Sequence, residues 1–124
     1  MYTLTIDDSF ASAHQLRGYK GKCENIHGHN WRVVFNVEGE NLNKIGLLID
    51  FHDLKDILKN ITNYLDHKNL NETPPFDEIN PSSENIACFI HERASEELEK
   101  TDPGIKVKSV TVWESDTSRC TYTR

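Results

Sequence analysis

Alternating apolar and polar residues predict two strands in the first third of the chain. Residues 2–6 alternate, and we expect the extended segment to continue through Phe10 to His14. The alternation returns from Ile26 to Glu38, and Gly39–Gly46 then has the composition of a turn. These two strands are expected to form an antiparallel pair. The apolar positions of the second strand are Trp31, Val33, Phe35 and Val37.

The spacing of apolar residues changes to a helical period after this pair. One stripe predicts a helix over Asp53–Leu65, with Asp50 or Phe51 near its start. A second helix is expected to begin around Ser82–Ser83, where hydroxyl groups can accept hydrogen bonds from free backbone N–H groups and Glu84 favours the positive end of the helix dipole. The apolar stripe of this second helix comprises Ile86, Phe89, Ile90, Ala94 and Leu98.

Two closing strands are expected over Ile105–Glu114 and Arg119–Thr123, joined by Ser115–Ser118. The apolar positions change face between Val107 and Val110, which indicates a β-bulge or a strand buried on both faces. The element order is therefore ββααββ, and the fold class is α+β with four strands.

Length and charge limit the classes of protein to consider. The chain has 124 residues and a net charge of −6, which favours one domain over residues 1–124 and disfavours nucleic acid or an anionic membrane as a partner. No apolar run approaches the roughly 20 residues of a membrane span, and the N-terminus does not resemble a signal peptide. The three cysteines are far apart in sequence, so we expect thiols in a reducing cytoplasm.

Three histidines in the first two strands are candidates for a metal site. His27 and His29 are two residues apart, so both imidazoles point to the same face of a strand. His14 ends the preceding strand and can lie opposite them. Three imidazoles without a fourth protein ligand are typical of a catalytic zinc site; the alternative is ordinary surface or hydrogen-bonded histidines. His52 and His91 have no such spacing and are expected at the surface or rim.

Two further segments carry candidate chemistry. Cys23 lies four residues before His27 and beside Lys22, so its thiol is a candidate base or nucleophile, or else an inert thiol. Asp66 next to His67 could orient an imidazole. Because adjacent side chains diverge, we expect the two residues to serve one site through different contacts, and His67 has the alternative of interacting with the end of the first helix. Cys88 and Cys120 are assigned no chemistry.

Taken together, these residues resemble the 6-pyruvoyl-tetrahydropterin synthase family, which includes the 6-carboxy-5,6,7,8-tetrahydropterin synthases of queuosine biosynthesis. The resemblance covers essentially the whole chain. The ordered motifs are Phe10-Ala11-Ser12-Ala13-His14, Cys23-x3-His27-Gly28-His29-Asn30-Trp31, Ile49-Asp50-Phe51, Leu65-Asp66-His67, Asn80-Pro81-Ser82-Ser83-Glu84-Asn85 and Trp113-Glu114.

The resemblance implies a role for each motif. His14, His27 and His29 would bind Zn²⁺, Cys23 would be the catalytic thiol, and Asp66 and His67 would relay protons. Glu114 would anchor a pterin, because a carboxylate accepts two parallel N–H bonds from the 2-amino-4-oxo edge of the ring. The implied substrate-binding residues are Glu114, Ser82, Ser83 and Glu84, the last of which could instead only favour the helix N-terminus.

The resemblance also implies a fold, an assembly and a reaction. The fold is the tunnelling fold, a four-stranded antiparallel sheet with two helices on one face, and subunits join their sheets into a barrel, usually a hexamer of two trimers with sites between chains. The three residues between Cys23 and His27 match the carboxy-tetrahydropterin type. The expected reaction converts 7,8-dihydroneopterin triphosphate into 6-carboxy-5,6,7,8-tetrahydropterin, acetaldehyde and triphosphate. Arg17, Lys20 and Lys22 could attract the triphosphate or form a solvated basic loop.

Three alternatives to this reaction stay open. The first is formation of 6-pyruvoyl-tetrahydropterin, which stops before the side chain is cleaved. The second is a non-catalytic pterin- or metal-binding module. The third is an iron oxygenase with three histidine ligands, which the two intervening helices disfavour.

Overall fold

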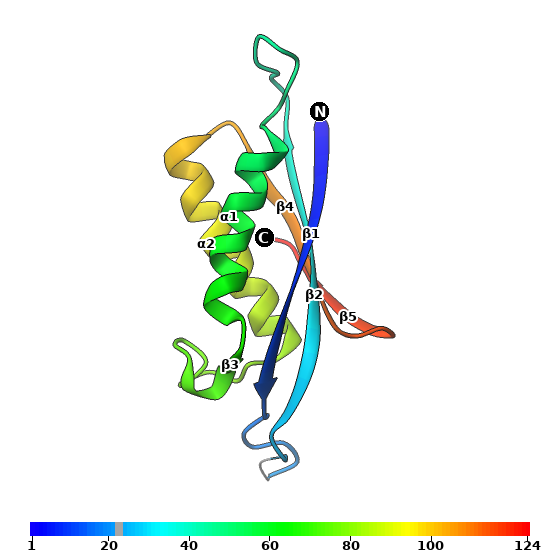
Figure 1. The fold of residues 1–124 in the computed structure, drawn as a ribbon, viewed down its shortest axis with the longest axis vertical. Coiled ribbons are helices and arrows are strands. Elements are labelled where there is room, and N and C mark those ends of the chain that lie inside the picture. The colour runs from blue at the N-terminus through cyan, green and yellow to red at the C-terminus, as the bar shows by residue number, and fades with distance from the viewer. Residues whose placement is uncertain (22–23) are drawn as a thin grey trace.

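The computed structural model describes residues 1–21 and 24–124 (Figure 1). Two helices form one layer, and a twisted sheet forms the other. In chain order the elements are β1 (Tyr2–His14), β2 (His27–Gly39), α1 (Phe51–Leu65), β3 (Lys68–Asn69), a 3₁₀ turn (Leu70–Glu72), α2 (Ser83–Thr101), β4 (Lys106–Ser115) and β5 (Ser118–Tyr122).

The sheet has the strand order β3-β1-β2-β4-β5. The four long strands are antiparallel, which confirms the expected α+β arrangement. The expectation of four strands missed β3, a two-residue strand that runs parallel to the end of β1 through the pairs Ser12–Lys68 and Ala13–Asn69. Two residues are too few to produce a periodic pattern, so hydrophobic alternation could not reveal β3.

The core lies between the helices and one face of the sheet. All four predicted apolar side chains of β2 are fully buried there, and the predicted stripe of α2 is buried as well. Each large aliphatic or aromatic side chain among them contributes roughly 1.5–3 kcal/mol through removal of its surface from water. From α1, the buried residues are Leu54, Leu58, Ile61, Thr62 and Leu65.

The helices begin where polar side chains can cap them. Asp50 accepts a hydrogen bond from the His52 backbone N–H at 2.8 Å, and Ser82 accepts one from the Asn85 backbone N–H at 3.1 Å. These bonds satisfy backbone donors that the first turn of a helix leaves unpaired. The expected change of face in β4 is a bulge at Lys108, because Asn36 pairs with Ser109 whereas the next residue of β2 pairs with Val107.

The face of the sheet opposite the helices is polar. Across its centre the Thr5 hydroxyl donates to the Asn36 side-chain carbonyl, and the Asn36 amide donates to Ser109 Oγ at 3.0 Å. Within residues 1–21 and 24–124, no element covers this face, and no strand pairs with the outer edge of β5 or with that of β1 before Ser12. The sheet therefore ends in two edges with free backbone hydrogen-bonding groups.

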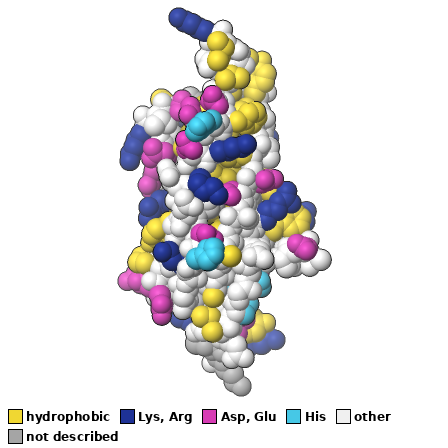
Figure 2. All heavy atoms as spheres, in the orientation of Figure 1, with side chains coloured by type: hydrophobic (Ala, Val, Ile, Leu, Met, Phe, Trp, Pro, Cys, Tyr) yellow, Lys and Arg dark blue, Asp and Glu magenta, His cyan; other side chains and the backbone are white. Residues whose placement is uncertain are grey.

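Surface side chains differ between the helical layer and the loop that follows β2. Figure 2 shows charges of both signs spread over the helices and hydrophobic side chains gathered where the β2–α1 loop extends. Leu42, Ile45 and Phe51 are exposed in that region. Among the described residues, neither helix combines the length and the apolar character needed to cross a bilayer.

Asp8 connects β1 to α1 through two side-chain hydrogen bonds. Its substitution tests how much these bonds contribute to stability. Its carboxylate accepts hydrogen bonds from Lys59 Nζ at 2.9 Å and Thr62 Oγ1 at 2.7 Å. Burial would raise the pKa of Asp8, but the hydrogen bonds with Lys59, Thr62 and Ser9 outweigh it and lower the pKa below 3.8. We expect Asp8→Asn to reduce the free energy of unfolding at pH 7 by about 1–2 kcal/mol in urea denaturation.

The pH dependence of this effect has a definite sign. Because the pKa of Asp8 is lower in the folded state, its stabilising contribution is present above the unfolded pKa and is lost as the pH falls through the folded value. The difference between Asp8→Asn and the wild type should therefore shrink in acid. Asp7→Asn is the control, since Asp7 is exposed and pairs only with exposed Arg32, and it should change stability by less than about 0.5 kcal/mol.

Candidate metal centre

Three imidazoles converge at the end of the sheet where β1 finishes and β2 begins. His14 pairs directly with His27 in the strand register, and His29 follows two residues later on the same face. The ring centroids lie 4.7 Å (His14–His27), 5.2 Å (His14–His29) and 4.7 Å (His27–His29) apart. The buried ring of Trp31 packs edge-on against His14 and His29 and fixes this side of the cluster.

Backbone carbonyl groups determine which ring nitrogen of two histidines faces inward as an acceptor. His14 Nδ1 lies 2.7 Å from the Pro81 carbonyl oxygen, and His27 Nδ1 lies 2.9 Å from that of Asn25. A carbonyl oxygen only accepts, so each Nδ1 carries the hydrogen and, in a neutral ring, each Nε2 presents a lone pair. Those two Nε2 atoms lie 3.2 Å apart. Two lone pairs repel one another, whereas a cation placed beside both would attract them.

His29 supplies a third nitrogen. Its Nε2 is buried and makes no hydrogen bond with any described residue, although Glu114 Oε1 is 3.3 Å away. Burial lowers the pKa of His29, and this outweighs the opposing effect of the Glu114 carboxylate. The imidazole is therefore held in the neutral form that a metal ligand requires.

The donor atoms of this cluster fit a divalent transition metal. The inward atoms of His14, His27, His29 and Glu114 all lie within 4.8 Å of one another. Three imidazole nitrogens with a carboxylate oxygen nearby form a typical ligand set for zinc. The carbonyl oxygen of Pro81 accepts a hydrogen bond from His14 Nδ1 and so fixes the orientation of that ring. Metal-binding histidines usually have such a partner on the ring nitrogen that does not face the metal. A second cluster among the described residues, His52, Asp53 and Asp56, lies exposed on α1 and has no comparable support.

Glu114 lies between the histidines and an open cavity. The Ser83 hydroxyl donates to Glu114 Oε2 at 3.1 Å, while the other carboxylate oxygen faces His29. A cavity of about 350 Å³ adjoins them. Sequence reasoning gave Glu114 a role only as a pterin anchor and did not indicate that it lies beside His29. The cavity is lined by Ser83, Glu84, Glu114, Ser118, Arg119 and Cys120.

The two serines at the start of α2 have different contacts. Ser82 caps the helix through its hydroxyl, whereas Ser83 is buried and bonded to Glu114. Glu84 is exposed and lines the cavity. Of the two serines, only Ser83 therefore contacts Glu114 directly.

Asp66 and His67 touch each other, contrary to the expectation that adjacent side chains diverge. Asp66 Oδ2 lies 2.7 Å from His67 Nδ1, while Asp66 Oδ1 accepts the Ala11 backbone N–H at 2.9 Å. The contact is possible because His67 has a positive φ of 54°, which turns its side chain back. The Ala11 hydrogen bond, followed by that with His67, lowers the pKa of Asp66. No hydrogen bond among the described residues joins this pair to the histidine cluster.

The loop between β1 and β2 holds the remaining predicted residues. Cys23 and Lys22 lie outside the described residues, so their predicted roles stay predictions. Arg17 donates to the carbonyl oxygens of Phe76 and Ile79, both at 2.8 Å, so its guanidinium anchors the loop before α2. Lys20 is exposed beside the ring of Tyr19.

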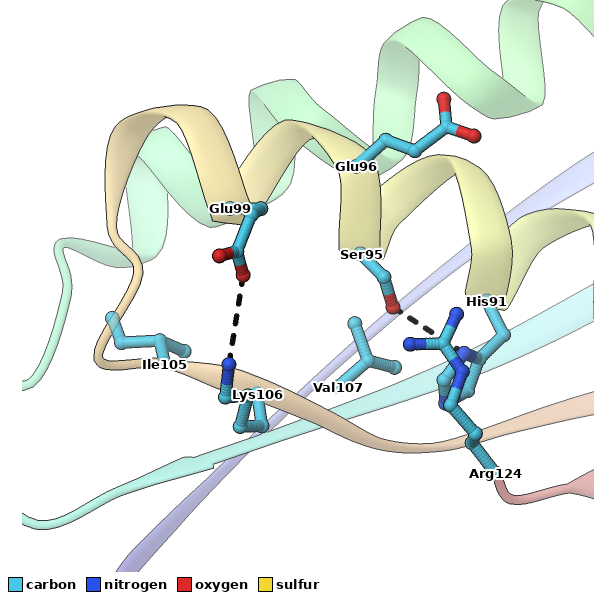
Figure 3. Close-up of a pocket in the computed structure, with 8 residues that line it drawn as sticks. All are labelled: His91, Ser95, Glu96, Glu99, Ile105, Lys106, Val107 and Arg124. Carbon is cyan, nitrogen blue, oxygen red and sulfur yellow. Dashed lines mark hydrogen bonds and ion pairs between the residues drawn. The ribbon is translucent and has the colours of Figure 1, made fainter.

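His91 was predicted at the surface, and this prediction is wrong. It lies on α2 with 1% of its surface exposed, edge-on to the ring of Tyr122 at 5.1 Å. Figure 3 shows it with Ser95 and Arg124 at a cavity of about 420 Å³. His91 is buried because β5 covers this part of α2. The apolar pattern of α2 alone cannot reveal a contact with a strand so distant in sequence.

The buried imidazole of His91 predicts a pH effect on stability. Burial, followed by the charge of Arg124, lowers the pKa of His91 below 6.5. The folded protein therefore binds this proton less readily than the unfolded chain, and stability falls as the pH drops below 6.5. Between pH 7.5 and 5.5, the melting temperature of His91→Phe should fall by less than that of the wild type. Exposed His52→Phe should follow the wild type; an unchanged pH dependence in His91→Phe would contradict the prediction.

Comparison with known families gives one consistent result. Residues 3–124 match the family model described as 6-pyruvoyl tetrahydropterin synthase. The chain is 32% identical to the 6-carboxy-5,6,7,8-tetrahydropterin synthase of Haemophilus influenzae, over 98% of this chain and 99% of that protein. It is 37% identical to the dihydroneopterin monophosphate aldolase of Pyrococcus furiosus, over 87% of this chain and 85% of that protein.

A solved structure supports the same relationship. The 6-pyruvoyl tetrahydropterin synthase of Caenorhabditis elegans superposes with a TM-score of 0.84 and 28% identity, over 99% of this chain and 95% of that chain. The two-layer fold described above is therefore shared across nearly the full length of both proteins.

Proposed function

We propose that this chain, which belongs to the 6-pyruvoyl tetrahydropterin synthase family, is a cytoplasmic zinc-dependent lyase of the queuosine pathway. Its substrates are 7,8-dihydroneopterin triphosphate and one molecule of water, and its products are 6-carboxy-5,6,7,8-tetrahydropterin, acetaldehyde and triphosphate. The observation that carries the proposal is the convergence of three Nε2 atoms beside Glu114. The name of the Haemophilus influenzae relative, which matches nearly end to end, supports this choice of product.

The proposed site contains one group of residues that bind the metal and the substrate and a second group that transfer protons. His14, His27 and His29 would hold the zinc, which when bound supplies Lewis acidity towards the side-chain hydroxyls of the substrate. Glu114 accepts hydrogen bonds from the amino edge of the pterin ring, and Ser83 holds one of its oxygens in place. Ser82 and Glu84 complete the proposed substrate-binding set at the start of α2.

Cys23 and the Asp66–His67 pair are the proposed proton-transfer groups. Cys23 removes a proton from the substrate side chain as a general base. Asp66 holds the ring of His67 through the 2.7 Å contact, and 83% of the His67 side chain is exposed. Because no hydrogen bond among the described residues joins this pair to the histidine cluster, we propose that it serves a site shared with a neighbouring subunit.

The free sheet edges support assembly into a homo-oligomer. Edge-to-edge pairing of β1 and β5 between subunits would satisfy the backbone groups left open there. We propose a hexamer built from two trimers, in which the polar face of the sheet lines a barrel. A molar mass from light scattering equal to that of one chain would exclude this assembly.

Product identification tests the proposed reaction. The purified protein is incubated with 7,8-dihydroneopterin triphosphate, and the pterin products are separated and weighed by mass spectrometry. We expect 6-carboxy-5,6,7,8-tetrahydropterin together with acetaldehyde. The solved Caenorhabditis elegans relative carries the name 6-pyruvoyl tetrahydropterin synthase, so accumulation of the pyruvoyl compound is the alternative outcome. Finding neither product from metal-loaded protein would favour a non-catalytic binding module.

A further inference from the structure

Ser12 is a buried polar residue between the two proposed groups of functional residues. It lies on β1, on the helix-facing side of the strand that also carries His14, and 7% of its surface is exposed. In the register of the sheet it pairs with His29 of β2 on one side and with Lys68 of β3 on the other. Ser12 therefore adjoins both a proposed metal ligand and the turn that contains His67.

The Ser12 hydroxyl closes the turn that follows α1. It donates a hydrogen bond to the backbone carbonyl oxygen of Leu65, the last residue of α1, and accepts one from the Lys68 backbone N–H at 3.1 Å. Asp66 and His67 are the two residues between these contacts. Removal of the hydroxyl would leave both backbone groups without this partner in a buried position, so the turn that carries the pair would loosen.

The residue before Ser12 adds two hydrogen bonds to the same turn. The Ala11 backbone N–H donates to Asp66 Oδ1 at 2.9 Å, and the Ala11 carbonyl oxygen accepts the His67 backbone N–H at 2.6 Å. These bonds fix the Asp66 carboxylate and the His67 backbone, while 83% of the His67 side chain is exposed. The imidazole is thus presented to solvent from a backbone that β1 holds in place.

The backbone of Ser12 also connects β1 to the proposed metal centre. Its carbonyl oxygen accepts a hydrogen bond from Trp31 Nε1 at 3.2 Å. The buried ring of Trp31 lies edge-on to His14 and His29, with centroid distances of 4.8 Å and 5.2 Å. The position of Ser12 therefore bears on both groups of residues.

We infer that Ser12 is a positioning residue, whose hydroxyl holds the Asp66–His67 pair in the place from which His67 transfers a proton. The inference rests on the proposed function, which gives this pair its role. Among the described residues, the only side-chain hydrogen bond of His67 is with Asp66, so the reach of its ring depends on the backbone that carries both. Misplacing a reacting group by about 1 Å can cost about 100-fold in rate.

Steady-state kinetics of Ser12→Ala separates positioning from a purely structural role. We expect kcat on 7,8-dihydroneopterin triphosphate to fall about tenfold with little change in KM, while the metal content per chain stays at the wild-type level. Thr62→Val is the matched control, because Thr62 is also buried and its hydroxyl also ties α1 to β1, by donating to Asp8 Oδ2 at 2.7 Å. This control should lower the melting temperature but keep wild-type kcat.

Two conservative variants complete the series. Ser12→Thr retains a hydroxyl and should recover most of the kcat that Ser12→Ala loses. Ser12→Cys is close to serine in size but its thiol is a weak donor, so its kcat should lie between those of Ser12→Ala and the wild type. It also provides the comparison with the wild type if Ser12→Ala does not fold.

Amide hydrogen exchange gives a second measurement that does not require turnover. Residues 66–69 should exchange faster in Ser12→Ala than in the wild type, and at the wild-type rate in Thr62→Val. Wild-type kcat or unchanged exchange in the folded Ser12 variants would overturn the inference, as would an equal loss of kcat in Thr62→Val. A wild-type protein that converts no pterin would refute the proposed function instead, and exchange over residues 66–69 would still decide whether Ser12 holds the pair.

Discussion

His14→Ala is expected to release the bound metal and to abolish turnover. His14 is 1% exposed, and its Nε2 atom lies 3.2 Å from that of His27, so its removal leaves the cluster with two imidazoles in place of three. Loss of even a supporting residue typically costs a metal site about 10–100-fold in affinity, and loss of a ligand should exceed that. The measurements are metal content per chain by mass spectrometry and kcat/KM on the pterin triphosphate.

A matched histidine variant distinguishes loss of the proposed ligand from a non-specific effect of replacing any histidine by alanine. His52→Ala removes an exposed imidazole that pairs only with Asp56, and it should keep both metal and activity. Circular dichroism of His14→Ala should retain the helical signal, because the apolar residues that pack both helices onto the sheet are unchanged. Full metal content in folded His14→Ala would show that the three histidines do not form the site.

Cys23→Ala is expected to lower kcat by about 10²–10⁴-fold while the metal remains bound, the range typical of losing a general base. The reason is chemical: alanine cannot accept the proton of the substrate side chain, and the three imidazole ligands are untouched. Rapid-quench measurement of product formation, together with metal content, gives both quantities from one preparation.

The control for this variant is Cys88, a half-buried thiol. Cys88 lies on α2 and is not among the proposed catalytic residues, so Cys88→Ala should retain wild-type kcat. Normal turnover by Cys23→Ala would exclude the thiol as the base. The proposed metal ligands would then have to act with a different proton acceptor, for which the Asp66–His67 pair is the next candidate.

Much of the metal centre follows from the periodicity of the sequence. A strand repeats every two residues, so the pattern of β2 alone places His27 and His29 on one face. The antiparallel pairing of two adjacent strands then brings His14 opposite, and the structure has the pair His14–His27 in register. Both steps depend only on strand periodicity and on the pairing of strands that are adjacent in sequence. The sequence alone was therefore enough to predict that the three histidines converge.

Other features depend on contacts that no local pattern reports. Glu114 comes beside His29 only because β4 pairs with β2, far along the chain. The burial of His91 depends on β5, and the contact between Asp66 and His67 depends on a left-handed residue that is not glycine.

The hydrogen bond between His14 and the Pro81 carbonyl links the proposed metal centre to folding. Pro81 immediately precedes the cap of α2, so the orientation of the His14 ring and the first turn of that helix depend on one another. By linkage, a metal that binds only the folded arrangement favours it by RT ln(1 + [M]/Kd). In the metal-bound protein, the free energy needed for local unfolding at the start of α2 should therefore be higher. Backbone amides there, Asn85 and Ile86 first, should exchange with solvent more slowly as the metal concentration rises.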